Sequence, residues 1–191
     1  MTEGWSRAVS ERPTRASRKG DKRIYIAYTG GTIGMRAGEG GYRPAPGYLA
    51  ERLAGMPELE RPELPRYHLR EYEPLLDSSN AGPEEWALMA ADIESNYDAY
   101  DGFVVLHGTD TMAFSASALS FMLDGLGKPV IFTGSQIPLA EVRSDARENL
   151  ITSMLLAASG EPAEVCIYLN GSLLRGNRAR KVSVDGFDAF Q

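Results

Sequence analysis

Cysteine and histidine are scarce in this sequence, which holds one cysteine and two histidines among 191 residues. A single cysteine cannot close an internal disulfide. The three residues together cannot supply the usual ligand set of a structural zinc site. We therefore expect no bound metal and no disulfide framework, and we expect a cytoplasmic protein.

Long hydrophobic runs are also missing, and basic residues are outnumbered. No run approaches the roughly 18 to 20 apolar residues that are needed to cross a bilayer. Lysine and arginine total 20 against 26 acidic residues, which gives a formal net charge of -6. An acidic surface repels nucleic acids and anionic membranes, so neither is expected as a partner. These absences favour small-molecule chemistry.

The first 22 residues differ in composition from the rest of the chain. Basic residues outnumber acidic ones there, and apolar residues are few and unpatterned. We expect residues 1–22 to form a disordered tail, without the features of a secretory signal. Residues 23–191 contain no repeat and no linker, and 43% of the whole chain is hydrophobic. We expect this stretch to be one globular unit.

Short apolar runs and helical patterns alternate through residues 23–191. Strands are expected at 23–29, 102–107, 128–133 and 164–169. Helices are expected where apolar residues recur every three or four positions. One follows Pro83, one runs from Met112 to Leu126, and one starts at Asp145 with a capping box to Glu148. The alternation predicts an α/β fold with three layers, a largely parallel sheet and helices on both faces.

The predicted strands end in similar polar, glycine-rich segments. These are TGGTIG at Thr29 to Gly34, HGTDT at His107 to Thr111, and TGSQ at Thr133 to Gln136. Ligands bind beyond the carboxyl ends of parallel strands, so these segments are expected to line one crevice. His107 itself is expected to be a packed, hydrogen-bonded residue, and Cys166 a small buried apolar one.

Two nucleotide-binding motifs do not fit the first segment. The dinucleotide fingerprint needs a further glycine where Thr32 stands, and the phosphate-binding loop needs a lysine followed by serine or threonine. The loop is instead suited to present a hydroxyl, with backbone amides near a developing oxyanion. No cofactor is expected.

The motifs at Thr29 to Gly34 and at His107 to Met112 resemble the paired signatures of the bacterial-type L-asparaginase family. Supporting segments are DSSN at 77–80, TGSQ at 133–136 and LRGNRARK at 174–181, and segments at 56–59 and 74–79 are most similar to the cytoplasmic type I branch. The resemblance covers residues 23–191. It implies the Rossmann-like or flavodoxin-like N-terminal domain of that family.

The resemblance implies a role for each of several polar residues. Thr32 matches the nucleophile that forms an acyl-enzyme, and Tyr42 matches the lid tyrosine that activates it. Thr109, Asp110 and Lys181 match a proton-relay cluster. In that cluster burial favours the neutral form of the lysine, while the nearby carboxylate favours its charged form. Asp110, together with Thr109, is expected to hold the substrate α-ammonium, and Ser78 with Ser79 the α-carboxylate. From the residues alone, helix capping ahead of Pro83 is an equally good interpretation of the two serines.

Three functions are compatible with these residues. The first is hydrolysis of L-asparagine to L-aspartate and ammonia. The second is an ammonia-producing subunit of a glutamyl-tRNA(Gln) amidotransferase, and the third is a non-catalytic ligand-binding domain on the same scaffold. Members of the resembled family carry a second, smaller domain and form homodimers or homotetramers. The resemblance therefore implies that this chain is an N-terminal domain and is poorly active alone.

Overall fold

The computed structural model describes residues 22–76, 78–184 and 186–191. The predicted tail at 1–22 lies outside these residues apart from Lys22. The Nζ of Lys22 donates to Asp101 at 2.9 Å, beside the start of the first strand.

A six-stranded sheet forms the middle layer, in the order β4-β1-β5-β6-β7-β8. The first five strands are parallel, and β8 pairs antiparallel with β7. Their bounds are β1 Arg23–Tyr28, β4 Arg66–Glu71, β5 Gly102–Leu106, β6 Val130–Thr133, β7 Val165–Leu169 and β8 Ser172–Arg175. The four predicted strands are confirmed. β4 and β8 are additions, and both lie at the edges of the sheet.

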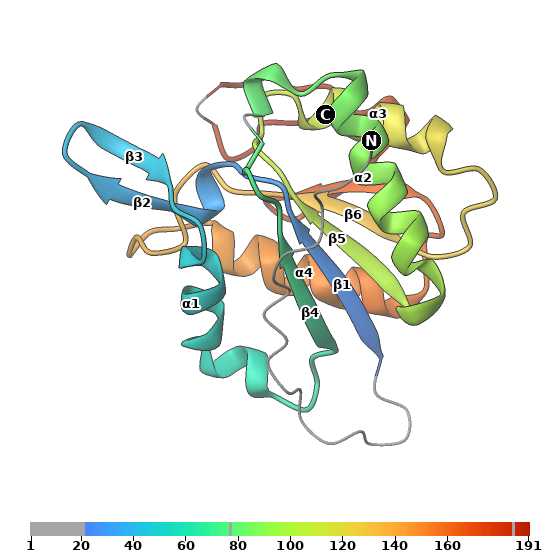
Figure 1. Ribbon diagram of the computed structural model, residues 1–191, viewed down its shortest axis with the longest axis horizontal. Helices are drawn as coiled ribbons and strands as arrows, with labels where there is room; N and C mark the ends of the chain where they lie inside the picture. The colour runs from blue at the N-terminus through green and yellow to red at the C-terminus, as the bar shows by residue number, and fades with distance from the viewer. Residues whose placement is uncertain (1–21, 77, 185) are drawn as a thin grey trace, which may run out of the picture.

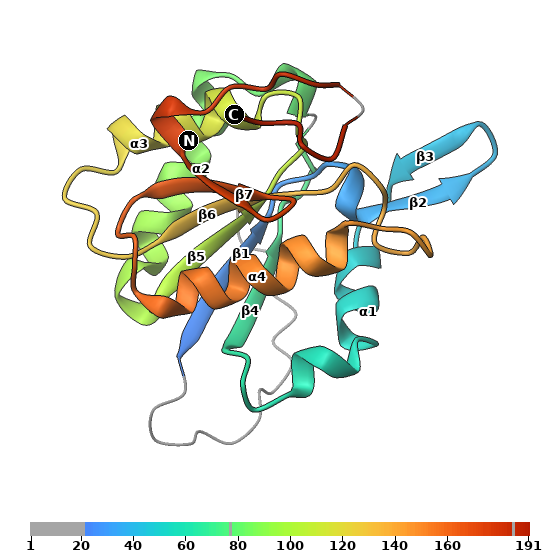
Figure 2. The same cartoon turned by 180° about the vertical axis from the view of Figure 1, so that it is seen from behind.

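Helices cover both faces of this sheet (Figures 1 and 2). α1 (Tyr48–Ala54) and α4 (Ala146–Ser159) lie on one face, and α2 (Pro83–Asn96) and α3 (Met112–Met122) lie on the other. The central strands supply both cores by alternation. In β1, Ile24 and Ile26 pack with α1 and α4, whereas Tyr25 and Ala27 pack on the opposite side. The predicted three-layer α/β fold is confirmed.

The order of the parallel strands is that of flavodoxin-like folds. Along the chain, β4 is the second of the parallel strands, after β1. In the sheet it lies beside β1, at the edge. β5 and the strands after it lie on the other side of β1. The direction of chain progression therefore reverses between β1 and β5. Ligands of such sheets bind at this reversal, beyond the carboxyl ends of the two strands.

Details of two predicted helices differ from expectation. α3 ends at Met122, whose side chain is 44% exposed, so the predicted apolar stripe does not continue to Leu126 as helix. α4 follows Asp145, but the predicted capping box with Glu148 is wrong. Glu148 instead accepts a hydrogen bond from Tyr168 at 2.5 Å. The Asp145 carboxylate is used by a neighbouring loop that is described with the site below.

The edge strand β4 is joined to α2 through the buried carboxylate of Asp92. Tyr25 and Tyr72 donate to it at 3.0 and 2.9 Å, and Arg70 forms an ion pair with it. A buried charge is tolerated only when its oxygens are bonded in this way. The cluster fixes the chain just after β4, from which the segment bearing Ser78 starts.

A separate hairpin of β2 (Met35–Gly38) and β3 (Gly41–Pro44) projects from the body near the end of β1 (Figure 1). Short 3-10 turns complete the structure. They are η1 Thr32–Gly34, η2 Pro57–Glu60, η3 Ser78–Asn80, η4 Tyr97–Ala99 and η5 Gly176–Arg178. Within the described part of the chain, no helix is long and apolar enough to span a membrane.

Candidate active site

Glycines let three loops touch one another by their backbones at the reversal between β1 and β5. A Cβ placed on Gly31 would lie 2.6 Å from the Gly108 nitrogen, and one on Gly30 would lie 2.4 Å from the Leu76 carbonyl oxygen. A Cβ on Gly108 would lie 1.9 Å from the Ser78 hydroxyl. These distances are too short for any side chain, so each glycine is required for the close approach. The loops after β1, β4 and β5 therefore form one unit.

Thr29 and Thr32 of the first loop have different surroundings. Thr29 is 1% exposed, and its hydroxyl donates to the Leu106 carbonyl at 2.9 Å, which joins the ends of β1 and β5. Thr32 starts η1 and is partly exposed. It directly follows Gly31, as Thr109 directly follows Gly108, so the two threonines flank the same backbone contact. Thr32 is thus the threonine of this motif that a ligand can reach.

Thr109, Asp110 and Lys181 come together as the family resemblance implies. The Lys181 ammonium donates to the Thr109 hydroxyl at 3.0 Å and to Asp110 Oδ1 at 2.6 Å. The lysine side chain is 14% exposed and that of Asp110 is 64% exposed. Thr109 is 8% exposed. The charge pair is therefore open to solvent on the Asp110 side and covered on the lysine side.

A folded-back segment at the end of the described chain holds Lys181 in place. Arg180 and Gln191 exchange two backbone hydrogen bonds, at 2.8 and 3.1 Å, and Val182 donates to the Ala189 carbonyl. Ala189 is fully buried in the core on the α2 and α3 side of the sheet. This anchoring places a lysine far along the chain next to the end of β5.

Gln136 is a site residue whose role the sequence did not predict. Its Nε2 donates to the carbonyls of Val184 and Gly186 at 3.1 and 2.9 Å. Its Oε1 lies 3.4 Å from the Thr109 hydroxyl, which donates to it. Gln136 thus connects the loop after β6 to the segment beyond Lys181. The signal in the sequence was its place in the TGSQ segment after a predicted strand, which was expected to line the crevice and which supported the family resemblance.

Asp145 and Asn149, at the start of α4, hold this loop. The two Asp145 carboxylate oxygens accept hydrogen bonds from the backbone N–H groups of Gln136 and Ile137, both at 3.0 Å. Asn149 is fully buried, donates to the Gly134 carbonyl and accepts from the Asn170 N–H, each at 3.0 Å. The sequence pattern assigned Asp145 to a helix cap, but its carboxylate is hydrogen-bonded to this loop instead.

Ser78 and Ser79 lie in η3, in the chain between β4 and α2. Ser78 rests against Gly108, and the Thr111 hydroxyl donates to its carbonyl oxygen. Ser79 is exposed. Neither serine caps α2, because its N-cap is Gly82, whose N–H donates to Glu85 at 2.8 Å. The capping interpretation of the two serines is therefore wrong.

Tyr42 lies on β3 of the projecting hairpin. Its side chain is 49% exposed. A hydrogen bond to Glu141 raises the pKa of the Tyr42 phenol, and the negative charge of Glu141 acts in the same direction. The structure does not join Tyr42 to the cluster at Thr109 and Lys181. Its predicted action on Thr32 stays a prediction.

The other residues singled out by the sequence behave as expected. His107 is 1% exposed and hydrogen-bonded, and burial lowers its pKa. Cys166 is 2% exposed, and burial raises the pKa of its thiol to about 11. The described residues contain no group of three or more His, Cys, Asp or Glu side chains that could hold a metal ion.

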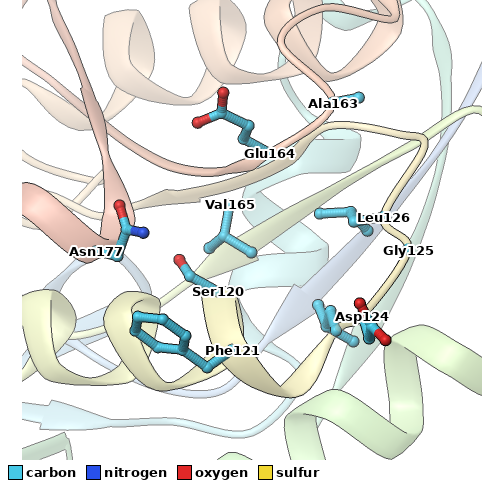
Figure 3. Close-up of a pocket in the computed structure, with 10 residues that line it drawn as sticks. Ser120, Phe121, Asp124, Gly125, Leu126, Ala163, Glu164, Val165 and Asn177 are labelled. Atoms are coloured by element: carbon cyan, nitrogen blue, oxygen red, sulfur yellow. The ribbon is translucent and has the colours of Figure 1, made fainter.

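A cavity of about 510 Å³ lies at the opposite, amino-terminal end of the sheet, between the end of α3 and the start of β7 (Figure 3). Phe121, Asp124 and Glu164 line it. The Glu164 carboxylate is already paired with Arg175 at 3.0 Å. None of the predicted site residues lines this cavity.

Known proteins share the sequence and the fold of this chain. Residues 23–191 match the family described as "Asparaginase, N-terminal". L-asparaginase 1 of Escherichia coli is 59% identical over 169 residues, covering 88% of this chain and 50% of that protein. The crystal structure of L-asparaginase I from Vibrio cholerae superposes with a TM-score of 0.84 at 55% identity, covering 90% of this chain and 51% of that one.

A more distant relative bears a different name. A glutamyl-tRNA(Gln) amidotransferase subunit of Methanopyrus kandleri is 36% identical over 180 residues, covering 88% of this chain and 38% of that protein. The chain therefore spans about half the length of the L-asparaginase relatives that it matches, and less of the amidotransferase relative.

Proposed function

The chain belongs to the asparaginase family, and on that premise we propose that the protein carrying it is an L-asparaginase. It would hydrolyse L-asparagine to L-aspartate and ammonia, without a cofactor or metal. The observation that carries the proposal is the contact of Lys181 with both Thr109 and Asp110 beside the loop that presents Thr32. We further infer a cytoplasmic homo-oligomer, a dimer or tetramer, as the family resemblance implies.

The first half of the reaction would be attack by Thr32 on the side-chain amide. The Thr32 oxygen bonds to the amide carbon while its proton leaves, and ammonia departs with that proton to leave an ester of Thr32. A threonine hydroxyl needs a neighbouring base for this step, which is the role we assign to Tyr42. Backbone amides of the glycine loops would stabilise the negative charge on the carbonyl oxygen.

The second half would be hydrolysis of the ester by water. Water adds to the carbonyl carbon, its proton returns to the Thr32 oxygen, and L-aspartate is released. The cluster of Thr109, Asp110 and Lys181 would move protons to and from that water. Thr109 accepts a hydrogen bond from the Lys181 ammonium, which places a charged proton donor one hydroxyl away from the crevice.

Substrate would be held by its α-amino and α-carboxylate groups. Asp110 Oδ1 accepts from Lys181, and its Oδ2 would accept from the α-ammonium with help from Thr109. The hydroxyls of Ser78 and Ser79 would donate to the α-carboxylate. The Ser78 hydroxyl rests against Gly108, which directly precedes Thr109 and Asp110.

The experiment that tests this proposal is ammonia release from L-asparagine by the full-length protein. Thr32→Ala should lower kcat by about a thousandfold or more, because the acyl-enzyme cannot form. Thr152→Ala, on α4 with its hydroxyl bonded to Glu148, is the matched threonine control and should leave the rate unchanged. Unchanged ammonia release by Thr32→Ala would remove the nucleophile assignment.

The amidotransferase alternative is favoured by relatives at 36% and 40% identity, against 59% for the asparaginase. Ammonia transfer to glutamyl-tRNA by the wild-type protein, with little free ammonia released, would support it. Binding of L-asparagine with neither reaction would support a ligand-binding domain.

A further inference from the structure

His107 is a buried titratable residue that the proposed reaction does not use, yet it directly precedes the site loop. Its ring is 1% exposed, and its Nδ1 lies 2.8 Å from the carbonyl oxygen of Gly108. A carbonyl oxygen only accepts hydrogen bonds. Nδ1 therefore carries a proton and donates it to Gly108.

The other ring nitrogen is held by a serine and a tryptophan from the two helices on that face. His107 Nε2 lies 3.1 Å from the Ser115 hydroxyl on α3. The indole Nε1 of Trp86, on α2, lies 3.1 Å from the same hydroxyl. An indole N–H only donates, so Ser115 accepts from Trp86 and has its own proton to give to Nε2.

One order of donation satisfies all four groups. Trp86 donates to Ser115, Ser115 donates to His107 Nε2, and His107 Nδ1 donates to the Gly108 carbonyl. This order requires neutral imidazole, and burial lowers the pKa of His107, which favours the neutral form. The tautomer of His107 is thus set by its partners.

We propose that His107 and Ser115 are positioning residues that fix the peptide joining Gly108 to Thr109. The inference rests on the proposed asparaginase function. A trans peptide is planar, and its C=O and N–H point in opposite directions. With the Gly108 carbonyl held toward the buried imidazole, the Thr109 N–H points away from it, toward the crevice between β1 and β5. That N–H can then donate to the oxygen on which negative charge develops.

The hydrogen bond from His107 is needed because glycine itself constrains the adjoining peptide only weakly. Gly108 has no side chain, and Ser78 occupies the space that a Cβ would need. Glycine allows backbone angles that other residues resist, so the peptide could rotate without an external bond. The backbone on the other side is already fixed, because His107 N–H donates to the Thr133 carbonyl at 2.9 Å. The imidazole supplies the remaining constraint.

Two amide substitutions in the full-length protein separate this role from packing. His107→Asn places an N–H near the position of Nδ1 and keeps donation to Gly108. His107→Gln reaches the position of Nε2, keeps the contact with Ser115 and leaves Gly108 unbonded. We expect His107→Gln to lower kcat for asparagine by about a hundredfold, with KM changed less than about threefold, as when one oxyanion donor is misplaced. His107→Asn should stay within about tenfold of wild type. Equal losses in both variants, or the reverse order, would overturn the proposal.

Ser115→Ala tests the tautomer with less disturbance, and the chain offers a matched control. Ser115 and Ser153 are both fully buried helical serines, but the Ser153 hydroxyl has no hydrogen-bond partner among the described residues. Ser115→Ala should lower kcat about tenfold, the equivalent of one lost hydrogen bond. Ser153→Ala should leave kcat unchanged. Similar kcat values for the two variants would contradict the proposal.

Nitrogen NMR of the histidine rings decides the tautomer without any assay of activity. The ring signals of His107 are identified as those that are present in labelled wild-type protein and absent from His107→Asn. They should show a protonated Nδ1 and an unprotonated Nε2. The Trp86 indole N–H signal should shift in Ser115→Ala and stay in place in Ser153→Ala. A protonated Nε2 in wild type would overturn the proposal. Wild-type protein that releases no ammonia would instead refute the proposed function, and the ring signals would still report the tautomer.

Discussion

The crevice between β1 and β5 and the β2–β3 hairpin are both rich in glycine, but glycine has a different role in each. At Gly31 a Cβ would lie 2.6 Å from the neighbouring backbone, whereas Gly40 and Gly41, at the hairpin turn, have no atom within 4 Å of a Cβ. All three have positive φ angles, which are 95° for Gly31, 94° for Gly40 and 122° for Gly41. Crevice glycine is therefore required for close packing as well as for backbone conformation, and hairpin glycine for conformation alone.

The polar side chains of the two regions differ in the same way. Thr109 and Lys181 are covered and bonded to each other, whereas Tyr42 is half exposed on a hairpin that projects from the body (Figure 2). The crevice is organised before substrate arrives. For the hairpin residue we expect a closing movement that brings Tyr42 to Thr32, as in enzymes that close a loop over the substrate.

Replacing one glycine of each region by alanine should give the largest difference between the two regions, in the free energy of unfolding. Gly31→Ala should destabilise the protein by about 4 kcal/mol, because backbone strain and overpacking add together. Gly40→Ala should cost only about 1 kcal/mol of strain. Chemical denaturation of the two variants measures both values. Equal losses would mean that the crevice loops can separate without penalty, contrary to the contacts of Gly31 and Gly108.

Phenylalanine at Tyr42 tests whether the hairpin matters for activity but not for stability. Tyr42→Phe should lower kcat about a hundredfold, the usual contribution of a positioned proton-transfer group. The free energy of unfolding should change by less than about 0.5 kcal/mol, as for other exposed residues. Kinetics with L-asparagine and a denaturation curve measure the two quantities. A clear fall in stability would show that the hairpin packs on the body more firmly than its exposure indicates.

A glutamine at Glu141 gives the smallest effect, which is confined to the hairpin tyrosine. Glu141 raises the pKa of Tyr42 by accepting its hydrogen bond and by its negative charge. Glu141→Gln should therefore lower that pKa toward the ordinary tyrosine value, and the phenol should titrate at lower pH. The pKa of Tyr28, on β1, is raised mainly by burial, so it should not change in Glu141→Gln. NMR titration of the tyrosine rings distinguishes the two residues, with Glu39→Gln at the hairpin turn as control. An unchanged Tyr42 titration would contradict the contact with Glu141.

The sequence predicted the features that depend on local pattern. Continuous apolar runs identified the buried strands β5 and β7, and the glycine and hydroxyl residues after the predicted strands identified the crevice. The edge strand β4 was missed because one neighbour and partial exposure let it carry Arg66, His68 and Arg70 among apolar residues. Its polar pattern does not distinguish a strand from a loop.

Features that depend on distant partners could not be predicted from the residues alone. The local pattern assigned Asp145 to a helix cap, but the N–H groups of Gln136 and Ile137 bind its carboxylate. The pairing of Lys181 with Thr109 spans 72 positions and was expected only through the family resemblance. The hydrogen bonds that link Trp86 to Gly108 were not anticipated, because His107 was predicted to be packed and hydrogen-bonded without any partner being identified.

The separation of these partners has a consequence for how the site arises during folding. Thr29 bonds to Leu106, 77 positions away, and Lys181 bonds to Thr109 across β6, α4 and β7. Contacts between such distant positions form late, since the entropy of closing the intervening chain must first be overcome. The crevice can therefore exist only in molecules whose central strands have already assembled in order. Partly folded chains would hold all the same residues and have no site.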